Sequence, residues 1–500
     1  MIDALSWFAV YPEIILLVMA CVIALVDLGV RDRGRTLSYV LALLTLAWVA
    51  IVTGSHALGG ETVYGFGKMV VSEPMGNWLK CFAALTLMAT LVYGRPYAAD
   101  RDMLRGGEFF TLGLFSLLGA FLMISGHNFL VLYMGLELMT LSSYALVALR
   151  RDHATSTEAA MKYFVLGALA SGFLLYGLSM IYGATGSLDV GEVFKAIASR
   201  EVKHQVLVFG LVFVVAGLAF KLGAVPFHMW LPDVYHGAPT AATLAIGAAP
   251  QLAAFAMVIR ILVQGLMPLA IDWQQMLGVL AVGSLLVGNL AAVAQTNLKR
   301  MLAFSTIAQM GFLLLALLAG VVGGDKINAQ SAYGAAMFYV VTYVLTTLAV
   351  FGVIMLLARE GFESEDIVDL AGLNQRSPLY AGVMAVGMFS LAGVPPLVGF
   401  YAKLSVIDAL LSAQGNEYLY LALFAVIASL IGAFYYLRVV KVMYFDPVPA
   451  HVNPSIDATQ DVRVVLSLNA GLLLVLGLLP GGLMTLCSQS MASVLKSLGT

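Results

Sequence analysis

The sequence predicts an all-α polytopic membrane protein with about fourteen transmembrane helices, and three observations support this fold class. Hydrophobic residues make up 61% of the 500 residues and charged residues only 11%, whereas a soluble domain carries about 25% charged residues. Apolar stretches of about 20 residues, the length that crosses a bilayer as a helix, recur along nearly the whole chain. Alternation of period two, which a transmembrane β-barrel requires, is absent.

The apolar stretches place the helices in order along the chain. The predicted helices are 10–30, 36–55, 75–94, 108–126, 128–149, 160–182, 205–236, 240–264, 274–296, 301–322, 332–358, 379–412, 418–444 and 464–487. The first stretch has no basic segment before it and no small-residue cleavage site, so we expect an uncleaved first span. The connection 183–204 is predicted to be a loop.

Prolines interrupt two of these helices. Pro226 falls inside the seventh and the pair Pro395 and Pro396 inside the twelfth, and a proline in a helix interior removes a hydrogen bond and costs about 3 kcal/mol. Each broken helix is fourth in a block of five, 108–264 or 274–444, and the blocks enter the membrane from opposite sides. We therefore expect two inverted five-helix repeats, flanked by three N-terminal helices in 1–107 and a last helix at 464–487, in a single membrane domain 1–500.

Basic residues follow the odd-numbered helices. Arg31, Arg33 and Arg35 follow the first helix and Arg150 and Arg151 the fifth. Because Lys and Arg concentrate in cytoplasmic loops, these connections are predicted to be cytoplasmic and both termini to lie outside.

Three charged residues fall inside predicted spans, near the helix breaks or the membrane centre. They are Glu137, Lys221 and Lys403. A charge at the bilayer centre costs about 2.5–3.5 kcal/mol on insertion scales, and such residues mark ion or proton pathways. We interpret Glu137 as a carboxylate paired across helices with Lys221, and Lys403 as the last relay site before release. Static ion pairing for Glu137 and snorkelling of the lysines to an interface are the structural alternatives.

Two histidines follow the first break. His228 and His236 are candidate proton carriers because histidine titrates near neutral pH. Their alternative role is that of hydrogen-bonded interface residues.

Several function classes find no support. The net charge is −2, which does not favour nucleic-acid binding. The cysteines Cys21, Cys81 and Cys487 are too widely spaced for a disulfide framework or an iron–sulfur cluster. Neither a dinucleotide-binding nor a phosphate-binding glycine motif occurs. We expect no cofactor and no metal in this chain.

The segments around the breaks resemble a known family. The stretches that carry the resemblance are FKLGAVPFHMWLPDVYHGAPT (220–240), QTNLKRMLAFSTIAQMGF (295–312) and LAGVPPLVGFYAKL (391–404). They are similar to the antiporter-like membrane subunits of respiratory complex I, and the resemblance covers nearly the whole chain.

The resemblance implies a proton-translocating subunit without a redox centre. NADH, FMN, iron–sulfur clusters and quinone would be handled by other subunits, and the partners would be sister membrane subunits in a bacterial plasma membrane. The family's relay residues fall on Glu137, Lys221 and Lys403, whereas Gln251 stands where the family usually carries lysine or histidine in the eighth span. Gln251 can hold water but cannot titrate.

Two other functions stay open at this point. One is a subunit of a multi-subunit cation/proton antiporter, which shares these motifs. The other is a structural membrane subunit whose buried charges only fix packing.

Overall fold

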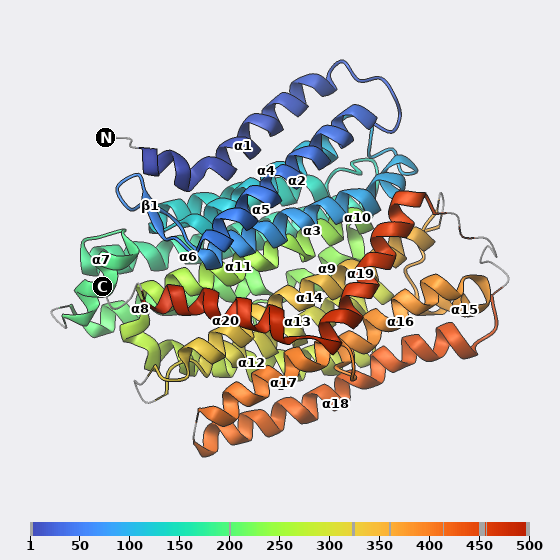
Figure 1. The fold of residues 1–500 in the computed structure, drawn as a ribbon. Coiled ribbons are helices and arrows are strands. Elements are labelled where there is room, and N and C mark those ends of the chain that lie inside the picture. The colour runs from blue at the N-terminus through green and yellow to red at the C-terminus, as the bar shows by residue number, and fades with distance from the viewer. Residues whose placement is uncertain are drawn as a thin grey trace.

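The computed structural model describes residues 4–199, 202–322, 326–359, 362–413, 415–449, 456 and 458–496. Within them, thirteen helices are long and apolar enough to cross a membrane. The broken pair α16 and α17 crosses once more, so the expected all-α polytopic fold is confirmed (Figure 1).

The helices follow the predicted order, with boundaries shifted by a few residues. They are α1 (Ala4–Asp27), α2 (Thr36–Gly59), α3 (Pro74–Ala99), α4 (Glu108–Ser125), α5 (Phe129–Val147), α6 (Ala154–Thr185), α7 (Val190–Ala198), α8 (His204–Leu222), α9 (Trp230–Gly237), α10 (Thr240–Gly247), α11 (Ala249–Val258), the π-helix η1 (Ile259–Gly265), the 3₁₀-helix η2 (Met267–Leu269), α12 (Ala270–Val293), α13 (Leu298–Leu318), α14 (Ala329–Leu357), the 3₁₀-helix η3 (Ile367–Leu370), α15 (Leu373–Arg376), α16 (Pro378–Ala392), α17 (Val398–Ser412), α18 (Asn416–Phe445), α19 (Gln460–Leu478) and α20 (Gly481–Lys496).

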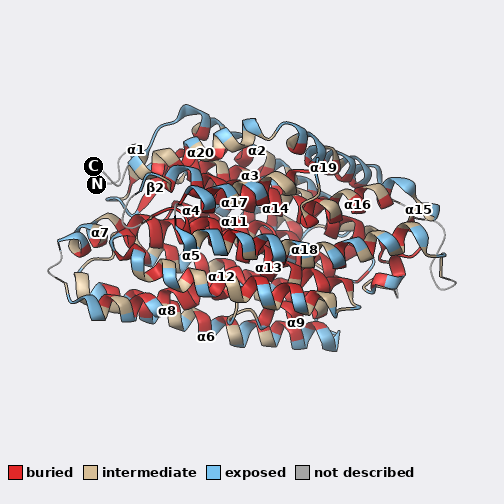
Figure 2. Ribbon diagram, turned by 90° about the horizontal axis from the view of Figure 1, so that it is seen from below, coloured by how far each residue is buried: buried red, intermediate tan, exposed pale blue. Residues whose placement is uncertain are grey.

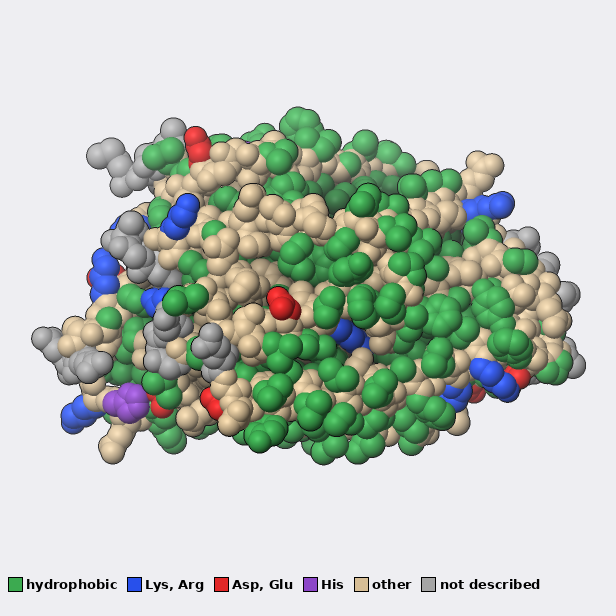
Figure 3. All heavy atoms as spheres, turned by 60° about the horizontal axis from the view of Figure 1, so that its bottom comes forward, with side chains coloured by type: hydrophobic (Ala, Val, Ile, Leu, Met, Phe, Trp, Pro, Cys, Tyr) green, Lys and Arg blue, Asp and Glu red, His purple; other side chains and the backbone are tan. Residues whose placement is uncertain are grey.

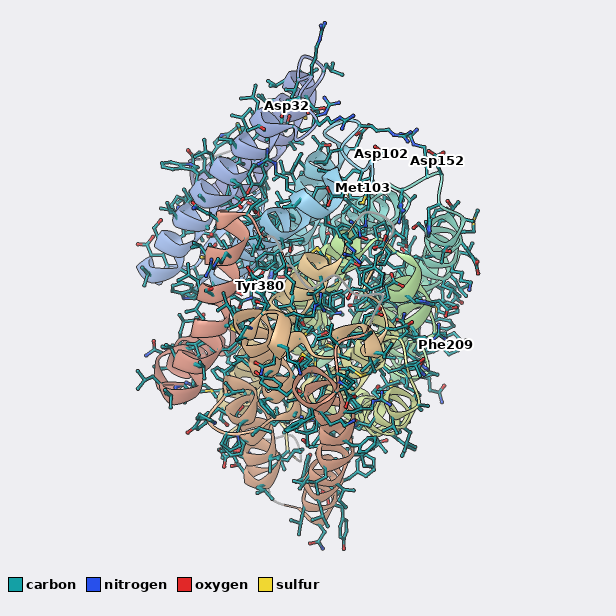
Figure 4. The ribbon with its side chains drawn as sticks, turned by 90° about the vertical axis from the view of Figure 1, so that its right-hand side faces the viewer. Asp32, Asp102, Met103, Asp152, Phe209 and Tyr380 are labelled. Atoms are coloured by element: carbon teal, nitrogen blue, oxygen red, sulfur yellow. The ribbon has the colours of Figure 1, made fainter. Side chains whose placement is uncertain are left out.

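The bundle has two distinct ends. The hairpin end carries α7 and the antiparallel strands β1 (Val63–Gly65) and β2 (Val70–Ser72), and both ends of the drawn chain lie there (Figure 1). The loop end carries the connections 28–35, 100–107, 148–153 and 358–377. Figure 4 looks onto the loop end, where Asp32, Asp102 and Asp152 lie on three of these connections.

Burial separates a central group of helices from a peripheral one. Helices α11, α13 and α14 are almost wholly buried, whereas α1, α6 and α18 expose much of their apolar surface (Figure 2). In the space-filling view, hydrophobic side chains cover the middle of the visible face and most charged side chains gather towards its two ends (Figure 3). This is the surface that a bilayer requires, because lipid tails do not solvate charge.

Helices α4 and α5 meet through two glycines. A β-carbon at Gly119 would lie 2.3 Å from the backbone nitrogen of Met139, and one at Gly135 would lie 2.7 Å from that of Met123. Only glycine allows the two backbones to approach so closely, and small residues serve this purpose in membrane helix pairs. The contact fixes the position of α5, which carries Glu137.

Both predicted breaks are present. Residues 223–229 separate α8 from α9, and residues 393–397 separate α16 from α17. Helix α8 runs inward from the hairpin end and α16 from the loop end, so the broken spans have opposite directions. The division of the chain into the blocks 108–264 and 274–444 stays a prediction.

Other boundaries differ from the prediction. The eighth span, expected to be continuous, bends at Ala248 (φ −112°, ψ −85°) and ends in the π-helix η1. The last span, expected at 464–487, is interrupted at Leu479 and Pro480, because proline cannot continue the hydrogen-bonding ladder of α19. The expected loop 183–204 contains the amphipathic helix α7.

Candidate functional site

The first break leaves Lys221 at a helix end in the middle of the bundle. Helix α8 stops at Leu222 because Gly223 adopts a left-handed conformation (φ 74°). Trp230 Nε1 donates to the Phe220 carbonyl at 2.9 Å, and Ser284 Oγ accepts from the Val225 amide at 2.9 Å. We expected the span to continue through Lys221, but the lysine lies in the last turn of α8. The partial negative charge of a helix carboxyl end favours an ammonium there.

The Lys221 ammonium is enclosed and has no hydrogen-bond partner among the described residues. Glu137 on α5 interacts with it electrostatically. Lys221 Nζ and the Glu137 carboxylate oxygens are more than 4.0 Å apart, however, so the direct ion pair expected from the sequence is not formed. Glu137 instead accepts a hydrogen bond from Ser171 on α6.

The second break is held by Lys403. The side chain reaches back from α17, and Nζ donates to the Ala392 carbonyl at 3.1 Å and to Ser429 Oγ of α18 at 2.9 Å. Only 8% of Lys403 is exposed. Snorkelling to an interface is therefore ruled out for Lys403.

Polar side chains of α13 and α14 line the same small cavity as Lys403. Gln309 Nε2 donates to the Leu391 carbonyl at 3.1 Å and to Tyr436 at 2.9 Å, and its oxygen accepts from Tyr339. Tyr343 donates to Thr306 Oγ1 at 2.8 Å. A cavity of about 20 Å³ lies against Gln309, Tyr343 and Lys403, which is enough room for one water molecule.

Gln251 lies where the eighth span bends. It occupies the first turn of α11, is 2% exposed, and its side-chain oxygen has no partner. A buried acceptor without a partner is costly unless water or a moving proton donor reaches it. Gln251 is thus placed to hold a water molecule.

The two histidines have different surroundings. His228 lies in the first break, half-buried, with an unpartnered Nδ1. His236 lies at the loop end, where its Nε2 is 3.9 Å from Glu365. Glu365 in turn pairs with the buried Lys299 at 2.6 Å. His236 therefore belongs to an ionisable cluster at the mouth of the bundle, and His228 lies deeper.

Three ion-pair groups lie at the loop end, and the sequence indicated none of their pairings between distant segments, although Asp233 was expected at the cytoplasmic mouth. Asp233 contacts Lys162 at 3.0 Å and Arg300 at 2.8 Å. Lys299 binds Glu365, and Glu363 binds both Arg101 and Arg150 at 2.9 Å. The paired residues come from helices and connections far apart in the chain, so sequence spacing gave no signal for these pairs.

The Glu363 cluster allows a prediction of pH dependence. Burial raises the pKa of the Glu363 carboxyl, but the hydrogen bond and charge of Arg101 outweigh it, and the pKa lies below the ordinary 4.5. A lowered folded-state pKa contributes stability that is present above the unfolded pKa and is lost as the pH falls through the folded one. Glu363→Gln is expected to destabilise the loop end by about 1–2 kcal/mol at pH 7.

Thermal unfolding of the purified complex at pH 7 and pH 4 would measure this effect. The difference in melting temperature between wild type and Glu363→Gln should be smaller at pH 4 than at pH 7. An equal difference in melting temperature at both pH values would contradict the ion pair assigned to Glu363. Glu158→Gln, which removes an exposed carboxylate paired with Lys162 at 2.9 Å, is the matched control.

The arrangement contains ionisable and hydrogen-bonding groups of the kind that can pass protons. Within the described part of the chain, no group of three or more His, Cys, Asp and Glu side chains could hold a metal ion. Two lysines lie beside the two helix breaks, Lys221 in the last turn of α8 and Lys403 in α17. This fold and site define the class of antiporter-like membrane subunits, in which discontinuous helices line an ion path.

Comparisons with known proteins give the family. The family described as "NADH:quinone oxidoreductase/Mrp antiporter, TM" matches residues 126–432. The NADH-quinone oxidoreductase subunit N of Polaromonas naphthalenivorans (strain CJ2) is 75% identical, with 100% of both chains covered. That of Herminiimonas arsenicoxydans is 60% identical, with 99% of each chain covered. The chain belongs to the family of NADH-quinone oxidoreductase subunit N.

Solved structures agree with this fold. A chain of respiratory complex I from Thermus thermophilus has a TM-score of 0.77 and 31% identity, covering 95% of this chain and 98% of that one. A chain of the Mrp complex from Dietzia sp. DQ12-45-1b has a TM-score of 0.84 and covers 98% and 97%, at 21% identity. The second likeness concerns the fold alone.

Proposed function

We propose that this chain translocates protons across the bacterial inner membrane as a subunit of NADH-quinone oxidoreductase. The single observation that carries the proposal is the placement of the buried Lys221 and Lys403 ammonium groups beside the two helix breaks. Electron transfer from NADH to quinone, with its FMN and iron–sulfur clusters, takes place in other subunits. The partners are the sister membrane subunits, and the loop end faces the cytoplasm, with both termini in the periplasm.

In this proposal each residue has a defined task. Protons enter at the loop end past His236, and His228 lies on the way to Lys221. Glu137 stabilises the charged form of Lys221. Gln251 and the hydroxyl groups near Gln309 hold water between the two lysines, and Lys403 releases the proton towards the hairpin end.

The chain needs an external source of work. Moving one charge against 100 mV costs about 2.3 kcal/mol, and nothing in the sequence motifs indicates a nucleotide or redox site of its own. The quinone-reducing subunits supply this work in the proposal. The most direct way for them to act is by changing the local field around Glu137 and Lys221.

Lys403→Gln tests the proposal. The variant keeps a hydrogen-bond donor for the Ala392 carbonyl but carries no exchangeable charge, so NADH-driven proton uptake by inverted membrane vesicles should fall about tenfold or more. Lys441→Gln is the matched control, because the Lys441 side chain is 63% exposed at the loop end of α18. Normal proton uptake per NADH in Lys403→Gln would reject the relay.

The same preparation separates the other candidate functions. Flavin and iron–sulfur absorbance that co-purifies with the chain supports the oxidoreductase, whereas sodium-dependent proton exchange without it supports an antiporter. If the lysine variants lower the amount of complex but leave proton transport per assembled complex unchanged, the subunit is structural.

A further inference from the structure

A second buried lysine–carboxylate pair lies near the hairpin end, outside the relay described above. Glu13 on α1 and Lys80 on α3 approach to 2.6 Å, and their side chains are only 6% and 1% exposed. Ser125, the last residue of α4, donates to Glu13 Oε1 at 2.6 Å. Replacing such a buried pair by apolar residues is often neutral or stabilising, so stability alone gives little reason for it.

The pair has the same components as the Glu137 site. In both places one carboxylate oxygen accepts from a serine on a neighbouring helix, Ser125 for Glu13 and Ser171 for Glu137. Lys80 Nζ, like Lys221 Nζ, makes no hydrogen bond to any described residue, although Lys80 has its ion-pair contact with Glu13. Glu13 Oε2 is buried and unpartnered. The pair therefore has unused capacity to bind and release a proton.

A neighbouring ion pair, Arg260 with Glu73, serves as a comparison because it has the contacts expected of a purely structural pair, called here a brace. Arg260 of η1 lies 2.6 Å from Glu73, the residue before α3. Its Nε and Nη2 donate to the Ile124 carbonyl at 3.1 and 2.9 Å, and Nη1 donates to Gln264 at 2.8 Å. Arginine keeps its proton in proteins. All three nitrogens of Arg260 donate hydrogen bonds, although Glu73 Oε1 has no hydrogen-bond partner in the described part of the chain. The Lys80 ammonium, by contrast, has only its ion-pair contact with Glu13 among the described residues.

One titratable group leads from the pair towards the surface. His56 of α2 interacts electrostatically with both Lys80 and Glu13, and its Nδ1 is unpartnered. It is half-buried and stacks on Phe8 with ring centroids 4.3 Å apart. The Phe121 ring centroid lies 5.6 Å from the Lys80 ammonium.

We propose that Glu13 and Lys80 form an additional proton-binding site, which exchanges protons with the hairpin end through His56. In its resting form the pair is Glu13 carboxylate and Lys80 ammonium. One proton adds to Glu13 Oε2, giving a neutral acid beside the ammonium, and its departure to His56 restores the pair. No electron moves, and no bond other than that to the proton is made or broken. This inference rests on the proposed function, since it adds a site to the same transport.

The double variant Glu13→Gln/Lys80→Gln tests the inference in the intact complex, reconstituted in vesicles and driven by NADH. It removes both charges together and keeps polar groups of similar size. We expect the number of protons moved per NADH to fall below wild type. Glu73→Gln/Arg260→Gln is the matched control, and it should keep the wild-type ratio because that pair is a brace.

The outcomes are distinct. If the single variants lower the ratio and the double variant restores it, the pair is a static brace and the inference fails. If the double variant does not assemble, Glu13→Asp is used instead, and an unchanged pH profile of proton transport would overturn the inference. If wild type itself moves no protons with NADH, the proposed function fails, independently of Glu13 and Lys80.

Discussion

Lys221→Ala is expected to stop most proton transport through this subunit. The ammonium lies enclosed in the last turn of α8, without a hydrogen-bond partner, and a methyl group can neither accept nor donate a proton. Acid–base groups contribute about 10²–10⁴-fold to proton transfer, so NADH-driven proton uptake by vesicles should fall by about tenfold or more. Fluorescence quenching of a pH-sensitive dye would measure it.

A charge-preserving variant separates proton transfer from electrostatics. Lys221→Arg keeps the positive charge, but the guanidinium does not release its proton, so it should be as defective as alanine. Lys195→Ala removes a lysine whose side chain is 63% exposed on α7, and it should leave transport unchanged. Full proton transport per NADH in either Lys221 variant would exclude Lys221 from the relay.

Glu137→Gln is expected to have the second-largest effect. The amide can still interact with Ser171, but it no longer stabilises the charged form of Lys221. Desolvation of the ammonium is then uncompensated, and proton transport per NADH should fall by about tenfold. The measurement is the rate of proton uptake divided by the amount of assembled complex.

Glu137→Asp is the conservative comparison, because it keeps the charge and shortens the side chain by one methylene. It should retain part of the activity. Glu192→Gln, a change of a 57% exposed carboxylate on α7, serves as the control. If Glu137→Gln and wild type transport protons equally, the carboxylate is only a packing element, which is the alternative that the sequence left open.

The sequence predicted those parts of the fold that depend on neighbouring residues, namely the apolar helices and the breaks at prolines. The spans of apolar residues predicted the helices, and the prolines at 226, 395 and 396 predicted both principal breaks. Each of these signals lies within one short segment of the sequence, because proline lacks a backbone amide and a lysine in an apolar segment is conspicuous. The bend at Ala248 was missed because Pro250 lies in the first turn of α11, a position that a helix tolerates. Pro480 did carry a signal for the break between α19 and α20.

The candidate site was predictable in its residues but not in its contacts. Glu137 and Lys221 are conspicuous charges in apolar segments, yet whether they touch depends on how α5, α6 and α8 pack. Lys403 is buried because α17 begins at Val398 and directs this side chain inward. Composition alone does not predict where α17 begins. Glu13, Lys80 and Arg260 also lie within apolar stretches, and a stricter search for single charges would have found them.

The bond from Lys403 to the Ala392 carbonyl spans the gap between α16 and α17. In the proposed relay, the ammonium that exchanges the proton is therefore also the group that links α16 to α17. Each time the charge leaves, the attraction to the exposed peptide end of α16 weakens. Protonation and deprotonation of Lys403 in the proposed relay would therefore change how firmly α16 and α17 are held together. Helices that pack against both segments would be affected by this change.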